Sequence, residues 1–478
     1  MRSLDPGLSR REFLRTAGFG VAGVLVLGSA ACSSSTKVAT SAFRSRPDLK
    51  PPVMTVTRAK GAALAPGRLF VTAGGPLILD DDGSPIWVHP LTGKAATNLR
   101  VQTYHGEPVL TWWEGQTAVG YGAGDYVIAD TSYRELRRVR AGNGLQGDLH
   151  EFVITPEGSA LFSIYDRTTA DLSPVGRAGT GPVLQGIVQE VDIDSGAVVF
   201  EWRSIDHVGL DESHSQLPAV GAPFDYFHVN SVDVDHDGNL LVSARNTWTV
   251  YKLDRRTGDV LWRLGGKRSS FAMGSGTDFE WQHDARRRPD GTLTLFDNGA
   301  APTVEELSRG LVLTLDERAG TAALVQQYTH PAVLAASQGN LQTLPNDDVL
   351  IGWGAEPYFT EFSKDGQLLL DARFPTGVGS YRAFRFPWTG SPTEEPAVAA
   401  LAGSGDRVDV YASWNGATEV ARWEALAGSK ASSLRSVGSA ARTGFETTIP
   451  VHTAASLVAA RALDAAGNVL ATSPAVRV

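Results

Sequence analysis

The sequence predicts an all-β protein, a β-propeller followed by a small β-sandwich. Short alternating strands recur from residue 52 to residue 389. Many of them are joined in pairs by Asp-Gly, Ser-Gly or Thr-Gly turns, which are the strongest sequence signal for a β-hairpin. No amphipathic helix of ordinary length interrupts them. Recurring hairpins with scattered tryptophans favour the repeated blades of a propeller over two stacked sheets.

The hairpins follow one another at quasi-regular spacing. The clearest cover residues 78–88, 191–200, 232–242, 251–264, 288–296 and 360–370. The length of this region suits six blades of roughly 56 residues, or seven or eight shorter blades. The spacing therefore leaves the number of blades open.

The C-terminal region has a different texture. Residues 390–396, Gly-Ser-Pro-Thr-Glu-Glu-Pro, form a linker, and residues 397–478 contain shorter alternating strands. About 80 residues of this kind suit a small Ig/fibronectin-like β-sandwich. The region holds no candidate catalytic cluster, so it is interpreted as a packing or adhesion module.

The first 32 residues have the three parts of an export signal. Arg10 and Arg11 form the pair that a twin-arginine translocase recognises, and residues 17–31 are apolar but too short to span a bilayer. The segment ends in Ser-Ala-Ala before Cys32, which resembles a bacterial lipoprotein cleavage site. We expect a lipid anchor at the outer face of the cell membrane; plain cleavage near Ala31 and a soluble secreted product is the alternative.

Composition restricts the rest of the chain. Cys32 is the single cysteine, so no intrachain disulfide forms. Residues 33–51 are rich in Ser, Thr, Lys and Arg, which is typical of a flexible tether. The formal net charge of −9 argues against a nucleic-acid partner, because phosphate binding needs a basic face. The sequence leaves the oligomeric state open.

Three histidines occupy the same place in three successive hairpin units. His150, His228 and His283 each precede a strand that leads into a turn. Equivalent positions in successive blades meet around one axis, so we expect the three imidazoles to lie close together. The alternative is that each histidine fills its own blade, hydrogen-bonded to backbone.

Arg245 follows His228 by 17 residues, at the far end of the next strand. A guanidinium would oppose a metal cation, whereas it binds an oxyanion through two parallel hydrogen bonds. We therefore expect no metal here, and a site for a sulfate or phosphate group. Glu151, Asn230 and Asp284 flank the histidines and are candidates for orienting them.

Two further motifs are given structural interpretations. Residues 233–238 imitate the start of a calcium loop, but Ala244 stands where the loop needs its twelfth-position Glu; we expect a hairpin turn. The basic run 286–288 is expected to form an exposed face beyond the His283 strand.

The segments 148–152, 227–231, 243–245 and 282–284 together resemble the bacterial arylsulfate sulfotransferases, also called arylsulfotransferases, and most closely a divergent actinobacterial and fungal branch. The resemblance covers most of residues 60–390 and extends to residues 381–388. It implies a six-bladed propeller with its site at the central channel. It also implies transfer of a sulfuryl group from a phenolic sulfate ester to a phenol, without a nucleotide donor or a cofactor.

Carried over residue by residue, the resemblance makes His283 the histidine that is transiently sulfated. His150, His228 and Arg245 match the groups that hold the sulfuryl oxygens and the phenolic oxygen. A neutral imidazole is a competent nucleophile near pH 7, and a histidinium can protonate the leaving phenolate. The chain departs from well-known members in lacking their cysteine pair and in carrying the C-terminal region.

Two other functions are alternatives to a sulfotransferase. A non-catalytic secreted propeller could bind an anionic ligand or a surface partner with the same pocket, and it would differ only in whether His283 is chemically competent. A quinoprotein-like oxidoreductase would need a calcium-ligating acid set and eight repeated tryptophan motifs, and the sequence shows neither.

Overall fold

The computed structural model describes residues 38–331 and 333–478, and within them the protein is all-β. Thirty-five strands form eight sheets, and the helical segments of this part of the chain are four 3-10 turns, η1 (Ser173–Val175), η2 (Ser204–Asp206), η3 (Leu210–Glu212) and η4 (Ala431–Ser433). None of the described helices has the length and apolar character needed to cross a membrane. The predicted export signal and Cys32 lie outside the described residues.

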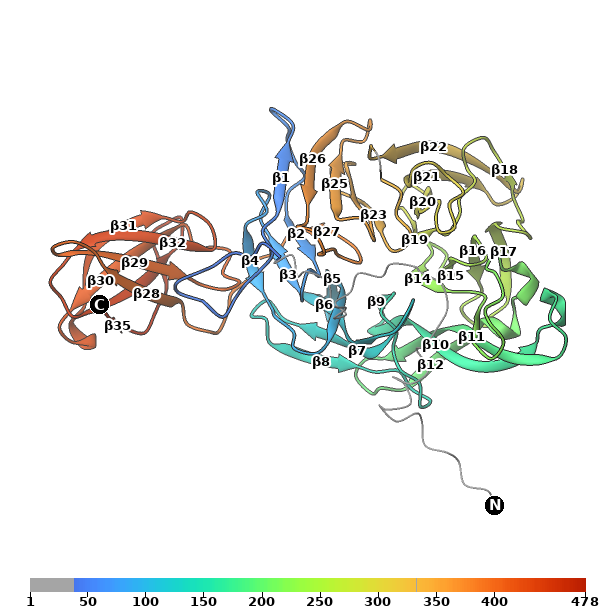
Figure 1. The fold of residues 1–478 in the computed structure, drawn as a ribbon, viewed down its shortest axis with the longest axis horizontal. Helices are drawn as coiled ribbons and strands as arrows, with labels where there is room; N and C mark the ends of the chain where they lie inside the picture. The colour runs from blue at the N-terminus through green and yellow to red at the C-terminus, as the bar shows by residue number, and fades with distance from the viewer. Residues whose placement is uncertain (1–37, 332) are drawn as a thin grey trace, which may run out of the picture.

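Six of the sheets stand side by side around a common centre, in a propeller-like arrangement (Figure 1). Neighbouring strands within each sheet are antiparallel, apart from two short parallel additions. The first three sheets are β27 (Phe384–Phe386), β2 (Arg68–Val71), β3 (Leu77–Leu79) and β4 (Pro85–Val88); β5 (Ala95–Tyr104), β6 (Glu107–Thr117), β7 (Gly122–Ala129) and β8 (Glu135–Val139); and β9 (Phe152–Ile154), β10 (Ser159–Asp171), β11 (Thr180–Asp192) and β12 (Val198–Arg203), with β13 (Phe224–Asp225) beside β11.

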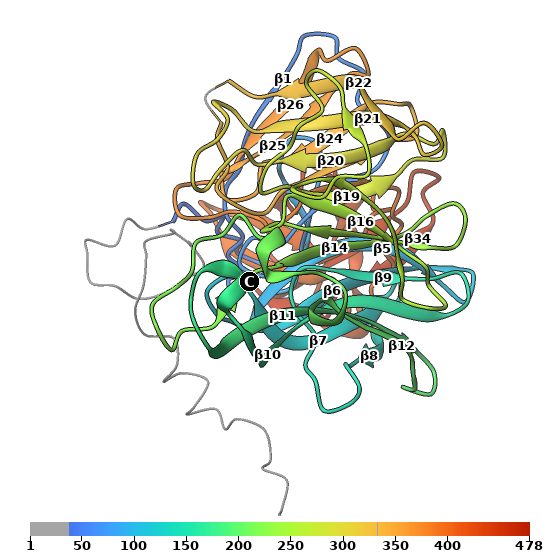
Figure 2. The ribbon, with the colours of Figure 1, turned by 90° about the vertical axis from the view of Figure 1, so that its right-hand side faces the viewer.

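The next three sheets continue around the centre in chain order. They are β14 (Val229–Val234), β15 (Leu240–Ala244), β16 (Thr249–Leu253) and β17 (Val260–Gly265); β19 (His283–Arg287), β20 (Leu293–Asp297), β21 (Arg309–Asp316) and β22 (Thr321–Thr329), with β18 (Ala272–Met273) beside β22; and β23 (Asn340–Thr343), β24 (Val349–Gly352), β25 (Tyr358–Phe362) and β26 (Leu368–Arg373), with β1 (Thr55–Arg58) beside β26. Seen from the side, β14 and β19 lie near the middle of the molecule (Figure 2).

The first and the last of these sheets each contain a strand from the opposite end of the propeller-like region. The late strand β27 pairs with the early strand β2, and the early strand β1 pairs with the late strand β26. Each pairing satisfies backbone groups that would otherwise form an open sheet edge. The chain therefore closes the ring from both directions.

All six predicted hairpins form. They are β3–β4, β11–β12, β14–β15, β16–β17, β19–β20 and β25–β26. The turn between β14 and β15 is a hairpin turn, as expected, because Gly238 adopts a φ of 83° that few other residues tolerate. The Asp235 carboxylate in this turn is bound by Lys252 at 3.0 Å and Arg287 at 2.9 Å.

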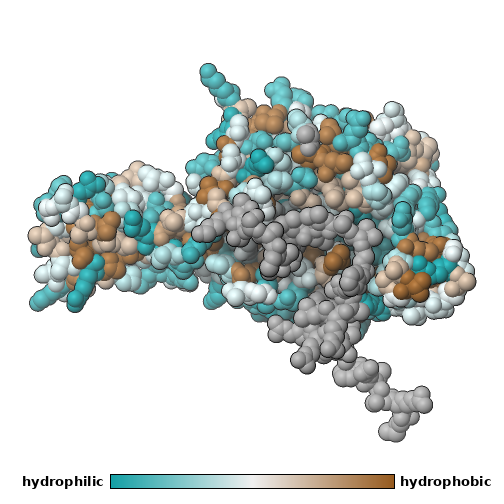
Figure 3. All heavy atoms as spheres, viewed as in Figure 1, coloured by the Kyte–Doolittle hydropathy of each residue, from teal (hydrophilic) through white to brown (hydrophobic). Residues whose placement is uncertain are grey.

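Apolar side chains fill the spaces between neighbouring sheets. One such core includes Leu161 of β10, Val229 and Val232 of β14, and Tyr251 of β16, each fully buried. Burying one side chain of this size stabilises the fold by about 1.5–3 kcal/mol. On the face seen in Figure 3, hydrophobic residues occur in groups among hydrophilic ones.

Residues 397–478 form two sheets around a core of their own, at one end of the molecule in Figure 1. This core includes Val410, Trp423, Ile449 and Val458. One sheet is β28 (Ala397–Ala402), β29 (Arg407–Ser413) and β32 (Glu446–His452). The other is β31 (Arg435–Ala441), β30 (Arg422–Gly428), β33 (Leu457–Leu463) and β34 (Val469–Thr472), with β35 (Val476–Arg477) beside β33.

Residues 38–51 differ from the expected flexible tether. Leu49 is 2% exposed, and the ring centroid of Phe43 lies 4.4 Å from that of Phe445. The backbone N–H of Ser45 donates to Glu446 at 2.6 Å. The polar composition predicts a tether, whereas these contacts hold the segment against the rest of the chain.

Candidate functional site

The candidate site lies where innermost strands begin. His150 precedes β9, His228 precedes β14, and His283 is the first residue of β19. The ring centroids of His150 and His228 are 5.1 Å apart. Tyr381, which precedes β27, joins the group: its ring centroid lies 5.5 Å from that of His150 and 6.5 Å from that of His283. Four sheets thus contribute one aromatic side chain each.

The backbone at these strand starts is unusual. His228, Trp281 and Asp284 have φ values of 57°, 58° and 57°, in the left-handed region that side-chain-bearing residues seldom adopt. The pairing register also shifts just after the histidines, within β14 and within β19. Such bulges turn side chains out of the regular alternation, and they concentrate next to functional sites.

Carboxylates orient two of the imidazoles. Nδ1 of His150 lies 2.5 Å from Oδ2 of Asp148, and Nδ1 of His228 lies 2.5 Å from Oδ2 of Asp225. A carboxylate accepts the Nδ1 proton, which leaves Nε2 of each ring as the atom that exchanges protons with a ligand. Neither aspartate is among the site residues predicted from the sequence, although each stands two or three residues before its histidine.

An amide orients the third imidazole. Nδ1 of His283 lies 2.7 Å from Oδ1 of Asn298, the residue that follows β20, and 3.2 Å from the carbonyl oxygen of Trp281. The Asn298 amide nitrogen donates to the carbonyls of Ala335 and Gln338, at 3.1 and 3.0 Å, so its oxygen must face His283. Both neighbours of Nδ1 accept, so Nδ1 carries the proton.

The other nitrogen of His283 therefore holds a lone pair. Nε2 accepts the backbone N–H of Gln338 at 3.1 Å. Burial lowers the pKa of His283 well below its usual range, and the positive charge of Arg245 and the two other histidines lowers it further. Burial also lowers the pKa of His228, against the opposing effect of Asp225. The His283 ring is neutral near pH 7.

Arg245 lies over an aromatic ring beside these histidines. Its guanidinium carbon is 4.6 Å from the ring centroid of Trp281. The guanidinium donates to Asn246 Oδ1 at 2.9 Å, to Ala336 O at 3.1 Å and to Ala301 O at 3.3 Å. Burial lowers its pKa to about 10, which still leaves it charged at neutral pH.

Two tyrosines line the same space. The ring centroid of Tyr165, on β10, lies 5.4 Å from those of both His150 and His228, and its hydroxyl donates to Val229 O at 2.8 Å. The hydroxyl of Tyr381 is buried and has no hydrogen-bond partner among the described residues. Burial raises the pKa of Tyr381, so it remains a donor. Its place before β27, equivalent to that of His150 before β9, was the signal available in the sequence.

Glu151 and Asp284 do not touch the imidazoles. Glu151 is fully buried and bonded to Arg100, Arg286 and Arg382. Asp284 bonds Arg286 at 2.7 Å and Arg382 at 3.2 Å. Residues next to the histidines point to the other side of the strand, so these carboxylates hold an arginine network instead of orienting the histidines.

Asn230 is also a connector. Its side-chain nitrogen donates to the backbone carbonyl of Gln282 at 2.6 Å, and its backbone carbonyl accepts from Arg382 at 2.9 Å. The prediction that residues 286–288 form an exposed face is wrong, because the side chains of Arg286 and Arg287 are only 18% and 4% exposed. They bond to buried carboxylates that are distant in sequence, which the local pattern could not reveal.

One group of carboxylates in the described part of the chain is compact enough to hold a metal ion. It consists of Glu280, Asp297 and Glu305. The three imidazoles do not belong to it.

The chain was compared with known proteins. A family model described as "Arylsulfotransferase (ASST)" matches residues 100–375, more than half of the chain, and this range includes the three histidines and Arg245. No curated protein matches the chain. Similar solved structures include a Bacteroides caccae protein of unknown function, at 16% identity and a TM-score of 0.40, covering 67% of this chain and 98% of that one. Virginiamycin B lyase from Staphylococcus aureus aligns at 9% identity and a TM-score of 0.31, covering 68% and 86%.

Proposed function

Because this chain belongs to the arylsulfotransferase (ASST) family, we propose that it moves a sulfuryl group from a phenolic sulfate ester to a phenolic acceptor, with His283 as the carrier and without a nucleotide donor. The tautomer of His283 carries the proposal. The hydrogen bond from Nδ1 to Asn298 leaves a lone pair on Nε2 of a buried, neutral ring, which is the state that a nucleophile requires.

In the first half-reaction, the Nε2 lone pair of His283 forms a bond to sulfur while the bond between sulfur and the phenolic oxygen breaks. The electron pair of that bond leaves with the phenolate. Arg245, which stays charged at neutral pH, offsets the charge on the sulfuryl oxygens. Such preorganised donors commonly contribute a factor of about 10²–10³ each.

One of the two other imidazoles, of His150 or His228, gives its Nε2 proton to the departing phenolate and becomes neutral. Each has its Nδ1 bonded to an aspartate, so the imidazolium formed by protonation at Nε2 has a charge partner. The anionic sulfate ester favours the protonated form of His228 when it enters, against the burial that lowers the pKa of this ring. General acid catalysis of this kind is worth about 10²–10⁴-fold.

The second half-reaction reverses the first. A new phenol gives its proton to a neutral imidazole, and its oxygen attacks sulfur. The bond between Nε2 of His283 and sulfur breaks, and the electron pair returns to Nε2. This double displacement predicts ping-pong kinetics, because the sulfuryl group is stored on the protein between the two phenols.

The hydrogen bond from Gln338 to Nε2 must break before attack, since both use the same lone pair. Gln338 has a φ of 66° and precedes Gly339, with a φ of 99°. We infer that these backbone positions move when the ester binds.

The remaining features form one consistent picture. The six sheets around the centre support a six-bladed propeller, and the two sheets of residues 397–478 support an Ig-like sandwich after the linker at residues 390–396. Residues 1–32 would direct export by the twin-arginine pathway, with Cys32 as the lipid anchor. A carrier on the protein suits that location, because nucleotide sulfate donors are made inside the cell.

The test is release of nitrophenol from 4-nitrophenyl sulfate by the purified protein, with and without phenol as acceptor. We expect phenol-dependent release, a sulfuryl adduct on His283 by mass spectrometry, and loss of both in His283→Ala. His236→Ala is the matched control, because this histidine is 64% exposed in the turn after β14.

The same experiment separates the alternative function. If the protein is a non-catalytic propeller that binds an anion, the ester should raise its Tm. No nitrophenol should then be released with any acceptor. That result, or undiminished release by His283→Ala, would overturn the proposal.

A further inference from the structure

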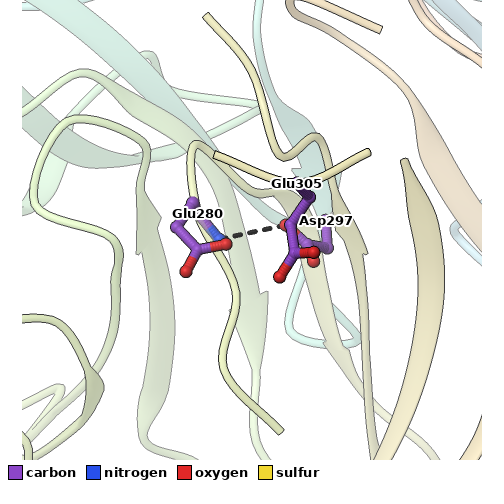
Figure 4. Close-up of side chains that lie close together, drawn as sticks. All are labelled: Glu280, Asp297 and Glu305. Atoms are coloured by element: carbon purple, nitrogen blue, oxygen red, sulfur yellow. Dashed lines mark hydrogen bonds between the residues drawn. The ribbon is translucent and has the colours of Figure 1, made fainter. Parts of the chain in front are cut away.

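Three carboxylates form a compact group close to the candidate site but apart from its imidazoles. Glu280 lies three residues before His283, Asp297 ends β20, and Glu305 lies in the loop that follows (Figure 4). Their nearest oxygen atoms all lie within 4.8 Å of one another, the side chain of Asp297 is buried, and so is Oε2 of Glu280. Segments from both sides of the β19–β20 hairpin therefore meet at this point.

Among the described residues, ion pairs balance this group only in part. Arg309 bonds Asp297 at 2.6 Å and Glu305 at 3.3 Å, so one guanidinium serves two of the three carboxylates. Oε2 of Glu280 is buried and has no hydrogen-bond partner among the described residues. A buried carboxylate oxygen without a partner is costly, and a bound cation removes the cost.

We propose that Glu280, Asp297 and Glu305 bind a divalent cation of the calcium type. The donor set is entirely oxygen, which suits hard cations and excludes the nitrogen and sulfur ligands typical of zinc sites. Calcium–oxygen bonds of about 2.3–2.6 Å allow two ligands to lie up to about 5 Å apart, so the group accepts this ion without contraction. Magnesium, at about 2.0–2.1 Å, would require the carboxylates to move together.

A cavity adjoins one member of the group. Glu280 lines a cavity of about 250 Å³, together with Trp248, Lys267 and Asp278. The cavity can hold the water molecules that would complete six to eight ligands around calcium. Arg309 need not leave, because it bonds Oδ2 of Asp297 and leaves Oδ1, which accepts only the backbone N–H of Glu280.

The cation would hold in place the two segments that contact Arg245. Residues 299–305 provide the Ala301 carbonyl that accepts from Arg245 and the Pro302 carbonyl that accepts from Trp281 Nε1 at 3.0 Å. Trp281, next to Glu280, is also the ring under the guanidinium. An ion between Glu280 and Glu305 therefore joins the two segments that position Arg245. This consequence rests on the proposed function; binding of the cation does not.

The test uses the full-length protein freed of metal by a chelator. Terbium is added as a calcium substitute, and its luminescence is excited through the protein, because Trp281 adjoins Glu280. We expect one site per chain, displacement by calcium, at least tenfold weaker displacement by magnesium, and a rise in Tm with calcium.

Glu280→Gln and Glu305→Gln should each weaken calcium binding at least tenfold and remove the rise in Tm. Glu306→Gln is the matched control: it removes the same charge from an exposed position in the same loop, and it should bind calcium like the unmodified protein. Glu305 is only partly buried, so its variant should fold even if Glu280→Gln does not.

Absence of stoichiometric binding, or unchanged binding in Glu305→Gln, would overturn the inference. Neither outcome depends on nitrophenol release, so a failure here is distinguishable from a failure of the proposed transferase. If both hold, calcium should raise kcat several-fold in the unmodified protein and leave Glu305→Gln unaffected.

Discussion

Oδ1 of Asn298 lies 2.7 Å from Nδ1 of His283, and this hydrogen bond decides which nitrogen of His283 is free to react. The asparagine is itself held by two backbone carbonyls, of Ala335 and Gln338. An amide in this place orients the ring without adding a charge, whereas carboxylates orient His150 and His228. Burial therefore lowers the pKa of His283 without an opposing carboxylate beside its ring.

Replacement of Asn298 by Asp should therefore change the pH dependence. A carboxylate at this place favours the imidazolium, so the pKa of His283 rises. Because imidazolium is not a nucleophile, the acid limb of kcat/KM for 4-nitrophenyl sulfate should move to higher pH. In the unmodified protein, that limb should lie below pH 6.5, since burial lowers this pKa.

Asn298→Ala is the companion variant, because it removes the orienting bond without adding a charge. It should lower kcat by about 10²-fold through misplacement of the ring, with little shift of the acid limb. An Asn298→Asp profile that coincides with that of the unmodified protein would contradict the assigned tautomer.

Tyr381→Phe should separate catalysis from stability. The hydroxyl has no hydrogen-bond partner within residues 38–331 and 333–478, so its removal should leave Tm unchanged or slightly raised. If the hydroxyl donates to the sulfuryl group during transfer, kcat should fall by about 10²-fold or more while KM changes little. Steady-state kinetics and a thermal melt measure the two effects, and a stable variant with full kcat would exclude Tyr381 from the reaction.

Arg245→Lys should retain the charge but lose the geometry. Lysine has no planar group to lie over Trp281, and it cannot reproduce the bonds to Ala301 and Ala336. We expect kcat of Arg245→Lys to fall at least tenfold, and kcat of Arg245→Met to fall further. Equal activity of the lysine variant and the unmodified protein would show that the charge alone is sufficient. Both rates are measured with saturating phenol.

The hairpin pattern was sufficient to predict the sheets and to recognise that His150, His228 and His283 occupy equivalent places. Those inferences depend on local turn chemistry and on repetition, which a sequence displays directly. The orienting residues were harder to find. Asn298 reaches His283 from the end of the following strand, and Tyr381 arrives through β27, which completes the first sheet from the far end of the chain.

The arginine network shows why local charge patterns mislead. The run at residues 286–288 has the composition of a solvated surface, yet Arg286 bonds Glu151, which lies 135 residues earlier in the chain. Only the closed ring of sheets brings the partners together. A carboxylate such as Glu151, beside a histidine in sequence, serves the interior under the site instead of the site itself.

Glu151→Gln should consequently destabilise the fold. Glu151 and Asp284 balance three buried arginines, and the Arg286, Arg382 and Arg100 charges overcome the effect of burial to lower the pKa of Glu151 to about 2. The variant leaves a buried positive charge without its partner, which typically costs about 3–5 kcal/mol. Urea unfolding measures the loss. Glu157→Gln, 66% exposed and 3.9 Å from Arg255, is the control and should change stability by less than about 0.5 kcal/mol.

The same residue predicts a pH effect of definite sign. The pKa of Glu151 is lower in the folded protein than its ordinary value of 4.5. Its contribution to stability is therefore complete above pH 4.5 and lost as the pH falls towards 2, because the unfolded chain takes up the proton first. The unmodified protein should lose stability over this interval more steeply than Glu151→Gln does. Parallel curves for the two proteins would mean that Glu151 is not the carboxylate that holds the arginines together.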